Sequence, residues 1–373
     1  MLLFDEKGEC FMKILFMSGN LTDGGAQRVI SVATSYLADK GHDVTLLLYT
    51  RNEKEYPLSE KVKVLSLASS PEEYKKISEI NRILLTRKLI KNTSPDVAIG
   101  FLEGGYGLFV SSFGMRFKKV SSIRSNPRLL WTVKGLRATI DKLWFHSSDA
   151  IIVQTESQVP LMKKRLRKKC TVIANPVSDE ALKRAKGESE YENCKKIIMA
   201  GRLATQKDYP VMINAMKKVV SKYPDVTLSI FGKGPLEGSL QAMIEESGLS
   251  DNILLKGWTN NTLDEYAKSD MYVMSSYYEG MPNALVEAMA MGLPCVSTDC
   301  ETGPSDIITD GDDGFLVPVK GVDALAERIL QIIEMSPEER KTMGEKAHNA
   351  IKDKFLSSKI LNQWEELFEG LLK

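Results

Sequence analysis

Short apolar runs typical of buried strands alternate with helical patterns along nearly the whole chain. The first repeat begins with the strand pattern KILFMS (13–18), passes through a glycine turn and a helical pattern, and closes with HDVTLLLY (42–49). Strand, turn, helix and strand in this order make a βαβ unit, whose strands are parallel. The sequence therefore predicts an α/β protein with open parallel sheets.

The alternation runs twice, which fits the two domains that 373 residues favour. Strand patterns recur at PDVAIGFL, KVSSIRS, DAIIVQT and CTVIANP, and after a polar stretch at IIMAGRL, DVTLSIFG, NILLKGW, MYVMSSY, CVSTDC and FLVPV. We expect an N-terminal extension (1–11), an N-terminal Rossmann-like domain (12–178), a linker (179–195), a C-terminal Rossmann-like domain (196–352) and a final helix (353–373).

Two of the predicted strands run directly into glycine turns. Gly24 and Gly25 follow the first strand, and Gly232 follows a strand of the second half. Ligands bind at the carboxyl ends of parallel strands, where glycine lets backbone approach them and a helix N-terminus favours anions. The first turn lacks a full G-x-G-x-x-G fingerprint, so a nicotinamide dinucleotide site is poorly supported and a plain tight turn remains an alternative.

Two cations follow the first strand of the second half. Arg202 comes directly after that strand, and Lys207 comes five residues later, near the start of the next helical pattern. Arginine offers bidentate hydrogen bonds and lysine a mobile point charge, so the pair is suited to hold a diphosphate. Two unrelated surface charges are the simpler interpretation of such a spacing.

The stretch EGMPNALVE (279–287) places two carboxylates around the start of a helix. Pro282 suits a first helical turn, and Gly292 suits the position after a helix end. Glu279 then lies in the loop after a strand, and Glu287 lies inside the helix. Phosphate binds well near such a helix start, and the two carboxylates could accept hydrogen bonds from sugar hydroxyls. An exposed loop Glu and a helix-surface Glu remain the alternative.

Charge is divided unevenly between the halves of the chain. Residues 1–178 contain 28 Lys and Arg against 17 Asp and Glu, whereas residues 179–373 contain 22 against 32. A basic half fits an anionic acceptor or an anionic membrane surface, and two solvated faces are the simpler reading. Few aromatic residues interleave with the basic ones, so we expect no nucleic-acid partner.

No apolar run approaches the roughly 18 residues that span a bilayer, and no signal peptide is visible. The five cysteines have no metal-binding spacing, which favours free thiols in a reducing cytosol. The acidic stretch DGDDG (310–314) fits a turn better than a cation site.

Together these motifs resemble those of the family-4 retaining glycosyltransferases, whose GT-B fold has two Rossmann-like domains facing a central cleft. EGMPNALVE is similar to the family's E-x7-E motif, GRLATQK to its Arg/Lys clamp, DGGAQR to its glycine loop and VIANPV to its interdomain segment. The resemblance covers nearly the whole chain from Met12. It implies a retaining hexosyltransferase of cell-surface polysaccharide synthesis that uses a nucleotide-sugar, usually a UDP-sugar, and a glycan or polyprenyl-diphosphate-linked acceptor.

Carried over by position, the resemblance implies catalytic roles for Arg202, Lys207 and Glu279. The donor-binding positions that it implies are Gly24, Gly25, Gly232, Gly280, Met281, Pro282, Asn283, Ala284 and Glu287. It favours front-face attack in which the leaving diphosphate takes the acceptor's proton. Since the two cations would stabilise that leaving group, we expect no metal and no cofactor.

The acceptor side departs from the family pattern. Many relatives carry a His in the N-terminal domain, whereas the corresponding strand end here reads GFLEGGYG and contains Glu103. We expect Arg28, Glu103 and Arg124 to contact the acceptor, with Arg124 suited to an anionic one.

Two other functions remain open. A GT-B nucleotide-sugar epimerase would turn over the donor without an acceptor, and a non-catalytic nucleotide-sugar-binding protein would only hold it. The presence of both cations and both carboxylates argues against an inactive site. We expect a cytoplasmic protein, peripheral at the inner face of the cell membrane, with the basic segments 116–119, 134–137 and 163–169 facing anionic lipid.

Overall fold

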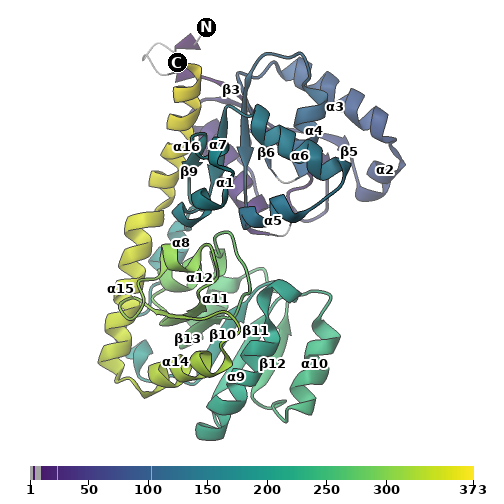
Figure 1. Ribbon diagram of the computed structural model, residues 1–373. Coiled ribbons are helices and arrows are strands. Elements are labelled where there is room, and N and C mark those ends of the chain that lie inside the picture. The colour runs from purple at the N-terminus through teal and green to yellow at the C-terminus, as the bar shows by residue number, and fades with distance from the viewer. Residues whose placement is uncertain (1–2, 5–9, 23, 102) are drawn as a thin grey trace. The chain divides into compact units, whose positions relative to one another are not determined.

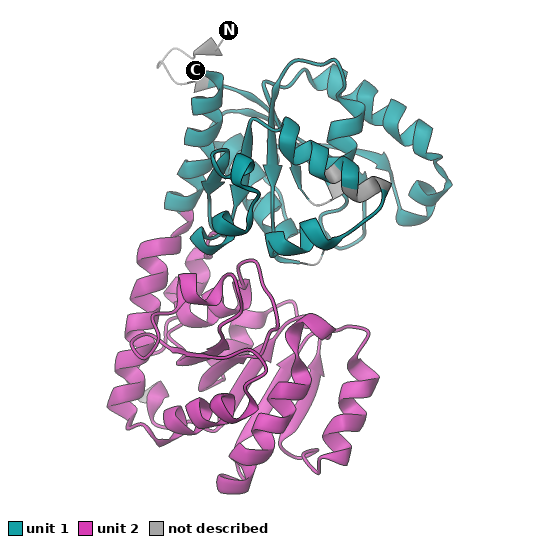
Figure 2. Ribbon diagram, in the orientation of Figure 1, with its two compact units in different colours: residues 1–175, 358–373 teal, residues 176–357 magenta. Residues whose placement is uncertain are grey.

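The computed structural model describes residues 3–4, 10–22, 24–101 and 103–373. Its contacts divide the chain into two compact units (Figure 2). Unit 1 comprises Met1–Asn175 together with Ser358–Lys373, and unit 2 comprises Pro176–Ser357. Unit 1 is therefore discontinuous in sequence.

Unit 1 is built on a seven-stranded parallel sheet in the order β5-β4-β3-β6-β7-β8-β9 (Figure 1). Its strands are β3 (Lys13–Ser18), β4 (Asp43–Thr50), β5 (Lys63–Ala68), β6 (Val97–Phe101), β7 (Lys118–Ser122), β8 (Ala150–Val153) and β9 (Cys170–Val172). A separate antiparallel pair joins β1 (Leu3–Phe4) to β2 (Cys10–Phe11). The strand order reverses between β3 and β6, which makes this pair the switch point of a doubly wound sheet.

One strand of the seven-stranded sheet was not predicted, and neither was the short pair β1 and β2. β5 lies at the edge of the sheet and is only partly buried, so its residues do not form the continuous apolar run that marked the other strands. A strand with one solvated edge needs fewer apolar residues than a central one.

The helices of unit 1 connect its parallel strands, except for the last one, which ends the chain. They are α1 (Gly25–Asp39), α2 (Pro71–Lys76), α3 (Glu79–Thr93), α4 (Glu103–Ser111), α5 (Pro127–Thr132), α6 (Leu136–Ser147), α7 (Lys164–Arg167) and α16 (Ser357–Leu372), with a 3-10 turn η1 (Glu156–Leu161). α3 contacts α4, and α4 contacts α6.

The helix α16 belongs to unit 1 through an aromatic cluster. The Trp364 ring stacks on Phe101 at 5.9 Å between centroids, and Phe16 and Phe368 pack at its sides. Trp364 and Phe368 are fully buried. Because such aromatic side chains bury large areas, this cluster holds the last helix on the β3 and β6 strands.

Unit 2 is built on a six-stranded parallel sheet in the order β12-β11-β10-β13-β14-β15. Its strands are β10 (Lys196–Ala200), β11 (Thr227–Phe231), β12 (Ile253–Gly257), β13 (Met271–Met274), β14 (Cys295–Thr298) and β15 (Phe315–Val317). The switch point lies between β10 and β13. The two sheets confirm the predicted pair of parallel α/β units.

The helices of unit 2 are α8 (Asp179–Lys183), α9 (Tyr209–Lys222), α10 (Glu237–Glu246), α11 (Thr262–Ala267), α12 (Asn283–Ala290), α13 (Pro304–Ile307), α14 (Val322–Glu334) and α15 (Pro337–Phe355), with 3-10 turns η2 (Glu188–Tyr191) and η3 (Thr205–Lys207). A capping box at Ser336 and Glu339 starts α15, and the predicted final helix divides at Leu356 into the end of α15 and α16.

The polar segment 179–195, predicted as a linker, is folded onto unit 2. Tyr191 is buried and donates a hydrogen bond to the Gly292 carbonyl at 2.9 Å. The buried Arg340 guanidinium donates to the carbonyls of Tyr191 and Glu192 and to that of Met335. An arginine that satisfies helix-end carbonyls in this way ties the segment to the start of α15. Composition did not predict this because the partners of the segment lie more than 100 residues away.

Among the described residues, no helix combines the length and the apolar character required to cross a bilayer.

Candidate functional site

The predicted site residues of unit 2 lie in the two loops that leave the switch-point strands. Arg202 and Lys207 follow β10, and Glu279 follows β13. β10 and β13 pair in parallel, so their carboxyl ends lie at the same edge of the sheet. This topology brings together residues that are 72 positions apart.

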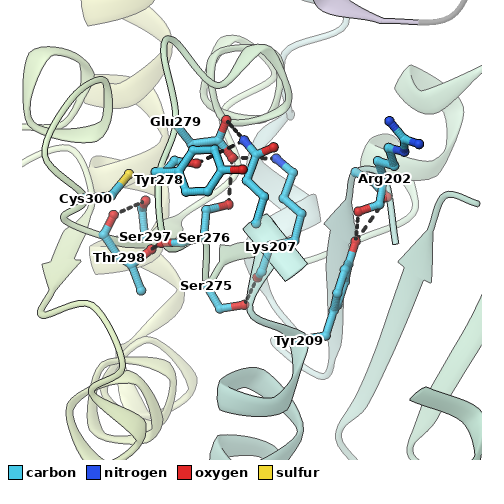
Figure 3. Close-up of polar contacts among 12 residues, drawn as sticks. Arg202, Lys207, Tyr209, Ser275, Ser276, Tyr278, Glu279, Ser297, Thr298 and Cys300 are labelled. Carbon is cyan, nitrogen blue, oxygen red and sulfur yellow. Dashed lines mark hydrogen bonds and ion pairs between the residues drawn. The ribbon is translucent and has the colours of Figure 1, made fainter. Parts of the chain in front are cut away.

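Lys207 and Glu279 form an ion pair. Lys207 Nζ lies 2.6 Å from Glu279 Oε1 (Figure 3). Both side chains are largely shielded, and Glu279 as a whole is only 7% exposed. Removing either partner would leave a charge in a weakly solvated place, which makes the pair strongly interdependent.

Two neutral side chains also donate to the Glu279 carboxylate. Ser276 Oγ donates to Oε1 at 2.7 Å, and Gln206 Nε2 donates to Oε2 at 3.2 Å. Gln206 Nε2 also donates to the Tyr278 carbonyl at 3.0 Å. Both carboxylate oxygens are therefore held, and the orientation of the group is fixed before any ligand arrives.

Backbone hydrogen bonds tie the loops to one another. Ser275 Oγ donates to the Lys207 carbonyl at 2.8 Å, and Tyr277 N donates to the Gln206 carbonyl at 2.7 Å. Thr298, at the end of β14, donates through Oγ1 to the Ser276 carbonyl at 2.7 Å. The ends of three neighbouring strands thus support one rigid carboxylate–ammonium pair.

Arg202 is not part of this pair. Its side chain is exposed, and Figure 3 shows the guanidinium pointing away from Glu279 and Lys207. Its carbonyl and that of Gly201 accept hydrogen bonds from the Tyr209 hydroxyl at 3.4 and 3.0 Å. The structure therefore fixes the backbone of Arg202 and leaves its guanidinium in solvent.

Contacts within the protein require glycine at position 232. The residue has a φ of +148°, and a Cβ there would lie 1.9 Å from the Gly201 carbonyl oxygen. A Cβ at Gly234 would similarly meet the Leu203 carbonyl oxygen at 2.3 Å. The turn after β11 thus packs directly on the turn after β10, and this contact accounts for the glycines without a ligand.

The EGMPNALVE stretch forms the loop and helix that the sequence predicted. α12 begins at Asn283 with Pro282 at its N-cap, and Gly292 follows its end with a φ of +77°. Gly280, Met281 and Pro282 are buried, and Asn283 and Ala284 are half-buried.

Glu287 lies on α12 but is not a surface residue. It is only 9% exposed, and the helix residues on either side of it are also buried. A carboxylate of this kind is retained when something satisfies it, so the surface interpretation of Glu287 is wrong.

The predicted residues Gly24, Gly25 and Arg28 belong to unit 1, where they form the turn after β3 and the first turn of α1. Gly24 has a φ of +134°, and its carbonyl accepts from the Arg28 amide at 3.2 Å. Glu103 is the first residue of α4, and its side chain lies outside the described part of the chain.

Arg124 follows β7 in unit 1, and its guanidinium lies beside the stacked rings of Phe101 and Trp364. Its guanidinium carbon lies 4.9 Å from the Phe101 ring centre and 5.3 Å from that of Trp364. Nε donates to Ser122 Oγ at 2.7 Å, and Nη1 donates to Asn175 Oδ1 at 3.0 Å.

The Arg124 charge is poorly compensated. Both of those partners are neutral, and Nη2 is buried without a hydrogen-bond partner among the described residues. Burial lowers the pKa of Arg124 to about 9. A partly buried cation in this condition is suited to an incoming anion.

Sequence reasoning missed four residues of the unit 2 site. Gln206 and Ser276 hold the Glu279 carboxylate, Thr302 donates to the Glu279 carbonyl, and Gly303 packs on the loop where a Cβ would lie 2.7 Å from the Gly280 carbonyl oxygen. Their only sequence signal is proximity to a strand end. Within the described part of the chain, no three His, Cys, Asp or Glu side chains gather as metal ligands.

Two protein-family models match the chain in succession. The model described as "Glycosyltransferase Family 4" matches residues 23–181, and that described as "Glycosyl transferases group 1" matches residues 181–350.

Curated relatives match over most of the chain. An uncharacterized glycosyltransferase of Methanocaldococcus jannaschii is 30% identical over 76% of this chain and 82% of the relative. A Campylobacter jejuni enzyme named as a GalNAc-alpha-(1->4)-GalNAc-alpha-(1->3)-diNAcBac-PP-undecaprenol alpha-1,4-N-acetyl-D-galactosaminyltransferase is 27% identical over 95% of this chain and 98% of that enzyme.

Solved structures share the fold. Anabaena HepE, in complex with UDP and glucose, aligns over 96% of this chain and 99% of its own with a TM-score of 0.79 and 17% identity. S. aureus TarM aligns with a TM-score of 0.66 and 24% identity, and the match spans 58% of its length.

Proposed function

Since the chain belongs to glycosyltransferase family 4, a family of retaining enzymes with the GT-B fold, we propose that it transfers a hexose or N-acetylhexosamine from a UDP-sugar. The acceptor is a glycan or a polyprenyl-diphosphate-linked sugar of cell-surface polysaccharide synthesis. The observation that carries the proposal is the Lys207–Glu279 pair at the switch point of the unit 2 sheet.

Lys207 and Glu279 have different roles in the transfer. Lys207 brings a positive charge to the place where the donor diphosphate gains negative charge as the glycosidic bond breaks. Arg202 leaves the same strand end with an exposed guanidinium, which is available to bind a phosphate from solvent. Glu279, oriented by Ser276 and Gln206, accepts hydrogen bonds from the donor sugar.

The held carboxylate argues for front-face attack. Glu279 Oε1 already accepts from an ammonium and a hydroxyl, so it is a weak nucleophile for double displacement. In front-face attack the acceptor oxygen bonds to the anomeric carbon, the bond from that carbon to the phosphate oxygen breaks, and the leaving diphosphate takes the acceptor's proton. The cations then serve the leaving group, and we expect transfer without a metal or cofactor.

The acceptor side of the proposal rests on unit 1. Arg124 is a partly buried cation whose hydrogen-bond partners are neutral, which suits an acceptor that carries a phosphate. Arg28 and Glu103 are the other acceptor-side candidates. The Campylobacter relative is named for an undecaprenol diphosphate acceptor, which supports a lipid-linked substrate here and a place at the inner face of the cell membrane.

The test is a donor screen. Purified protein is incubated with several UDP- and GDP-sugars, with and without polyprenyl-diphosphate-linked acceptors, and released nucleotide and sugar products are measured. We expect one UDP-sugar to be consumed faster with acceptor than without, with retention at the anomeric carbon and unchanged activity in EDTA.

Other outcomes of the screen point to other functions. An epimerised nucleotide-sugar formed without acceptor would identify the epimerase alternative. Tight UDP binding with no turnover of any donor would identify a binding protein. Activity lost in EDTA and restored by Mg²⁺ would overturn metal independence.

A further inference from the structure

Exposed apolar side chains gather in one part of unit 1. Among its described residues, every large apolar side chain that is exposed lies between positions 80 and 143. These side chains belong to α3, to the turn after α4 and to the α5–α6 region, and Figure 1 shows α3, α4 and α6 side by side over the sheet. Exposed apolar side chains that gather on neighbouring helices make this region a candidate interaction site.

The exposed side of α3 is the clearest part of this surface. Ile80 is 71% exposed, and Leu84 and Leu85 follow it on the outer side of the helix. The same side continues with exposed Lys88 and Lys91. A helix side that turns apolar side chains and lysines to solvent together can meet both the apolar and the anionic layer of a bilayer surface.

The turn after α4 extends the surface. Phe113 is 84% exposed and is followed by exposed Arg116. Arg87 of α3 donates through Nη1 to the carbonyls of Ser111 and Phe113, at 3.0 and 2.7 Å. These hydrogen bonds hold the backbone of the turn at α3, and the Phe113 side chain extends from this turn into solvent.

The α6 region adds further apolar residues. Leu143 and Val133 are about half exposed, and Lys142 Nζ donates to the Val133 carbonyl at 2.8 Å. Hereafter the α3–α6 face means the exposed side chains of Ile80, Leu84, Leu85, Phe113, Val133 and Leu143 with the basic residues between them.

The charge around this face is strongly positive. Residues 79–147 contain 12 Lys and Arg and 4 Asp and Glu, a net charge of +8. An apolar surface bordered by cations is complementary to an anionic bilayer, where apolar side chains enter the headgroup layer and ammonium groups meet lipid phosphates.

The most basic segment of the chain, residues 163–169, is the poorer candidate. It presents no exposed large apolar side chain among the described residues. Its charged groups also have internal partners: Lys169 Nζ donates to the carbonyls of His146 and Ser148, and Arg167 Nε donates to that of Met162. These contacts stabilise the α6–β8–α7 region of unit 1.

We propose that the α3–α6 face docks unit 1 on an anionic lipid bilayer. The inference deepens the proposed function, because it rests on a lipid-linked acceptor being used at a membrane surface. The docking surface is thus formed by helices that combine apolar and basic side chains. The segment 163–169, which is richest in basic residues, is not part of it.

The test compares two variants with the same change of charge. K88E/K91E reverses two lysines of the face, and K164E/K168E reverses two exposed lysines of the basic segment. Sedimentation with phosphatidylglycerol vesicles should fall about 30-fold or more for K88E/K91E, since each basic residue near an anionic surface contributes several-fold in affinity. K164E/K168E should retain most of its binding.

An apolar variant and a soluble acceptor complete the design. L84Q/F113Q should also lose vesicle binding, while all three variants keep wild-type melting temperatures and wild-type transfer to a water-soluble acceptor. If transfer fails with every acceptor while vesicle binding behaves as stated, the proposed function is wrong and the docking face stands.

Three results would overturn the docking face. One is equal loss of vesicle binding in the two charge variants, and another is wild-type binding by L84Q/F113Q. The third is a concentration-dependent dimer of the wild-type protein that L84Q/F113Q dissociates, which would make the face a protein–protein interface.

Discussion

Unit 1 and unit 2 share a strand order that reverses at one pair of strands, β3 and β6 in unit 1 and β10 and β13 in unit 2. In unit 2 the loops after these strands hold a lysine, a glutamate and two neutral donors. In unit 1 the first turn of α4 approaches β3 closely, because a Cβ at Gly104 would lie 2.1 Å from the Met17 carbonyl oxygen. The same topology thus supports a charged site in unit 2 and close backbone packing in unit 1. What each unit can do chemically therefore depends on its loop residues.

The first prediction tests the charged site of unit 2 by removing the Lys207 charge. Lys207→Ala should lower kcat by about 10²–10³-fold, because a preorganised charge that meets the leaving group is lost. Steady-state kinetics with the donor found in the screen measures the effect. Lys217→Ala, an exposed lysine of α9, is the control and should remain at the wild-type rate. An unchanged kcat for Lys207→Ala would remove Lys207 from the mechanism.

The second prediction tests the close backbone packing at the glycines of both units. Gly104→Ala and Gly232→Ala each place a Cβ within 2.1 Å of a carbonyl oxygen, in unit 1 and unit 2. Each should lower the free energy of unfolding by about 1–3 kcal/mol, as overpacking does.

The controls for these variants are glycines with open space. A Cβ at Gly238 or Gly370, both in helices, meets nothing within 4 Å. Alanine there should raise stability by about 0.5–1 kcal/mol through helix propensity. Denaturant unfolding measures all four variants, and equal stability across them would show that the close approaches relax without strain.

The third variant separates the tasks of the two units. Arg124→Met keeps a flexible side chain beside the Phe101 and Trp364 rings but removes the positive charge. If Arg124 meets an anionic acceptor, the acceptor KM should rise about tenfold, the value of one charge-assisted hydrogen bond. Donor hydrolysis without acceptor should not change. Lys75→Met, an exposed change on α2, is the control, and an Arg124→Met variant with an unchanged acceptor KM would limit Arg124 to packing.

The smallest expected effect concerns the orientation of Glu279. Ser276→Ala removes one donor to the carboxylate and should lower kcat/KM by about five- to tenfold, the value of one buried hydrogen bond. Ser297→Ala is the matched control, because its buried hydroxyl donates to the Thr298 carbonyl and not to Glu279. In a double-mutant cycle the loss from Ser276→Ala should shrink in a Glu279→Gln background. Additive losses would show that Ser276 acts independently of Glu279.

The centre of unit 2 could be predicted from sequence because β13 and β14 are buried on both sides. β13 reads as a continuous apolar run, and Pro282 and Gly292 marked both ends of α12. The edge strand β5 was missed because partial exposure leaves it without such a run.

The hydrogen bonds around Glu279 could not be predicted. Gln206 and Ser276 are neutral, short-range patterns give them no signature, and Gln206 lies 73 residues from its carboxylate partner. The burial of Glu287 could not be predicted either. A Glu in a helix is expected on the surface until the packing around that helix is known.

The discontinuity of unit 1 has a consequence for how the protein is made. The aromatic cluster of Phe16 and Phe101 is completed by Trp364 and Phe368, which the ribosome adds only after all 182 residues of Pro176–Ser357. At about 5–20 residues per second this interval is roughly 10–40 s. During that time the first 175 residues expose an unfilled apolar surface over β3 and β6 while unit 2 is still being synthesised. Unit 1 is therefore the first unit to be translated and the last to be completed. We expect chaperones to bind most strongly to nascent chains stalled within unit 2, because these chains expose that apolar surface.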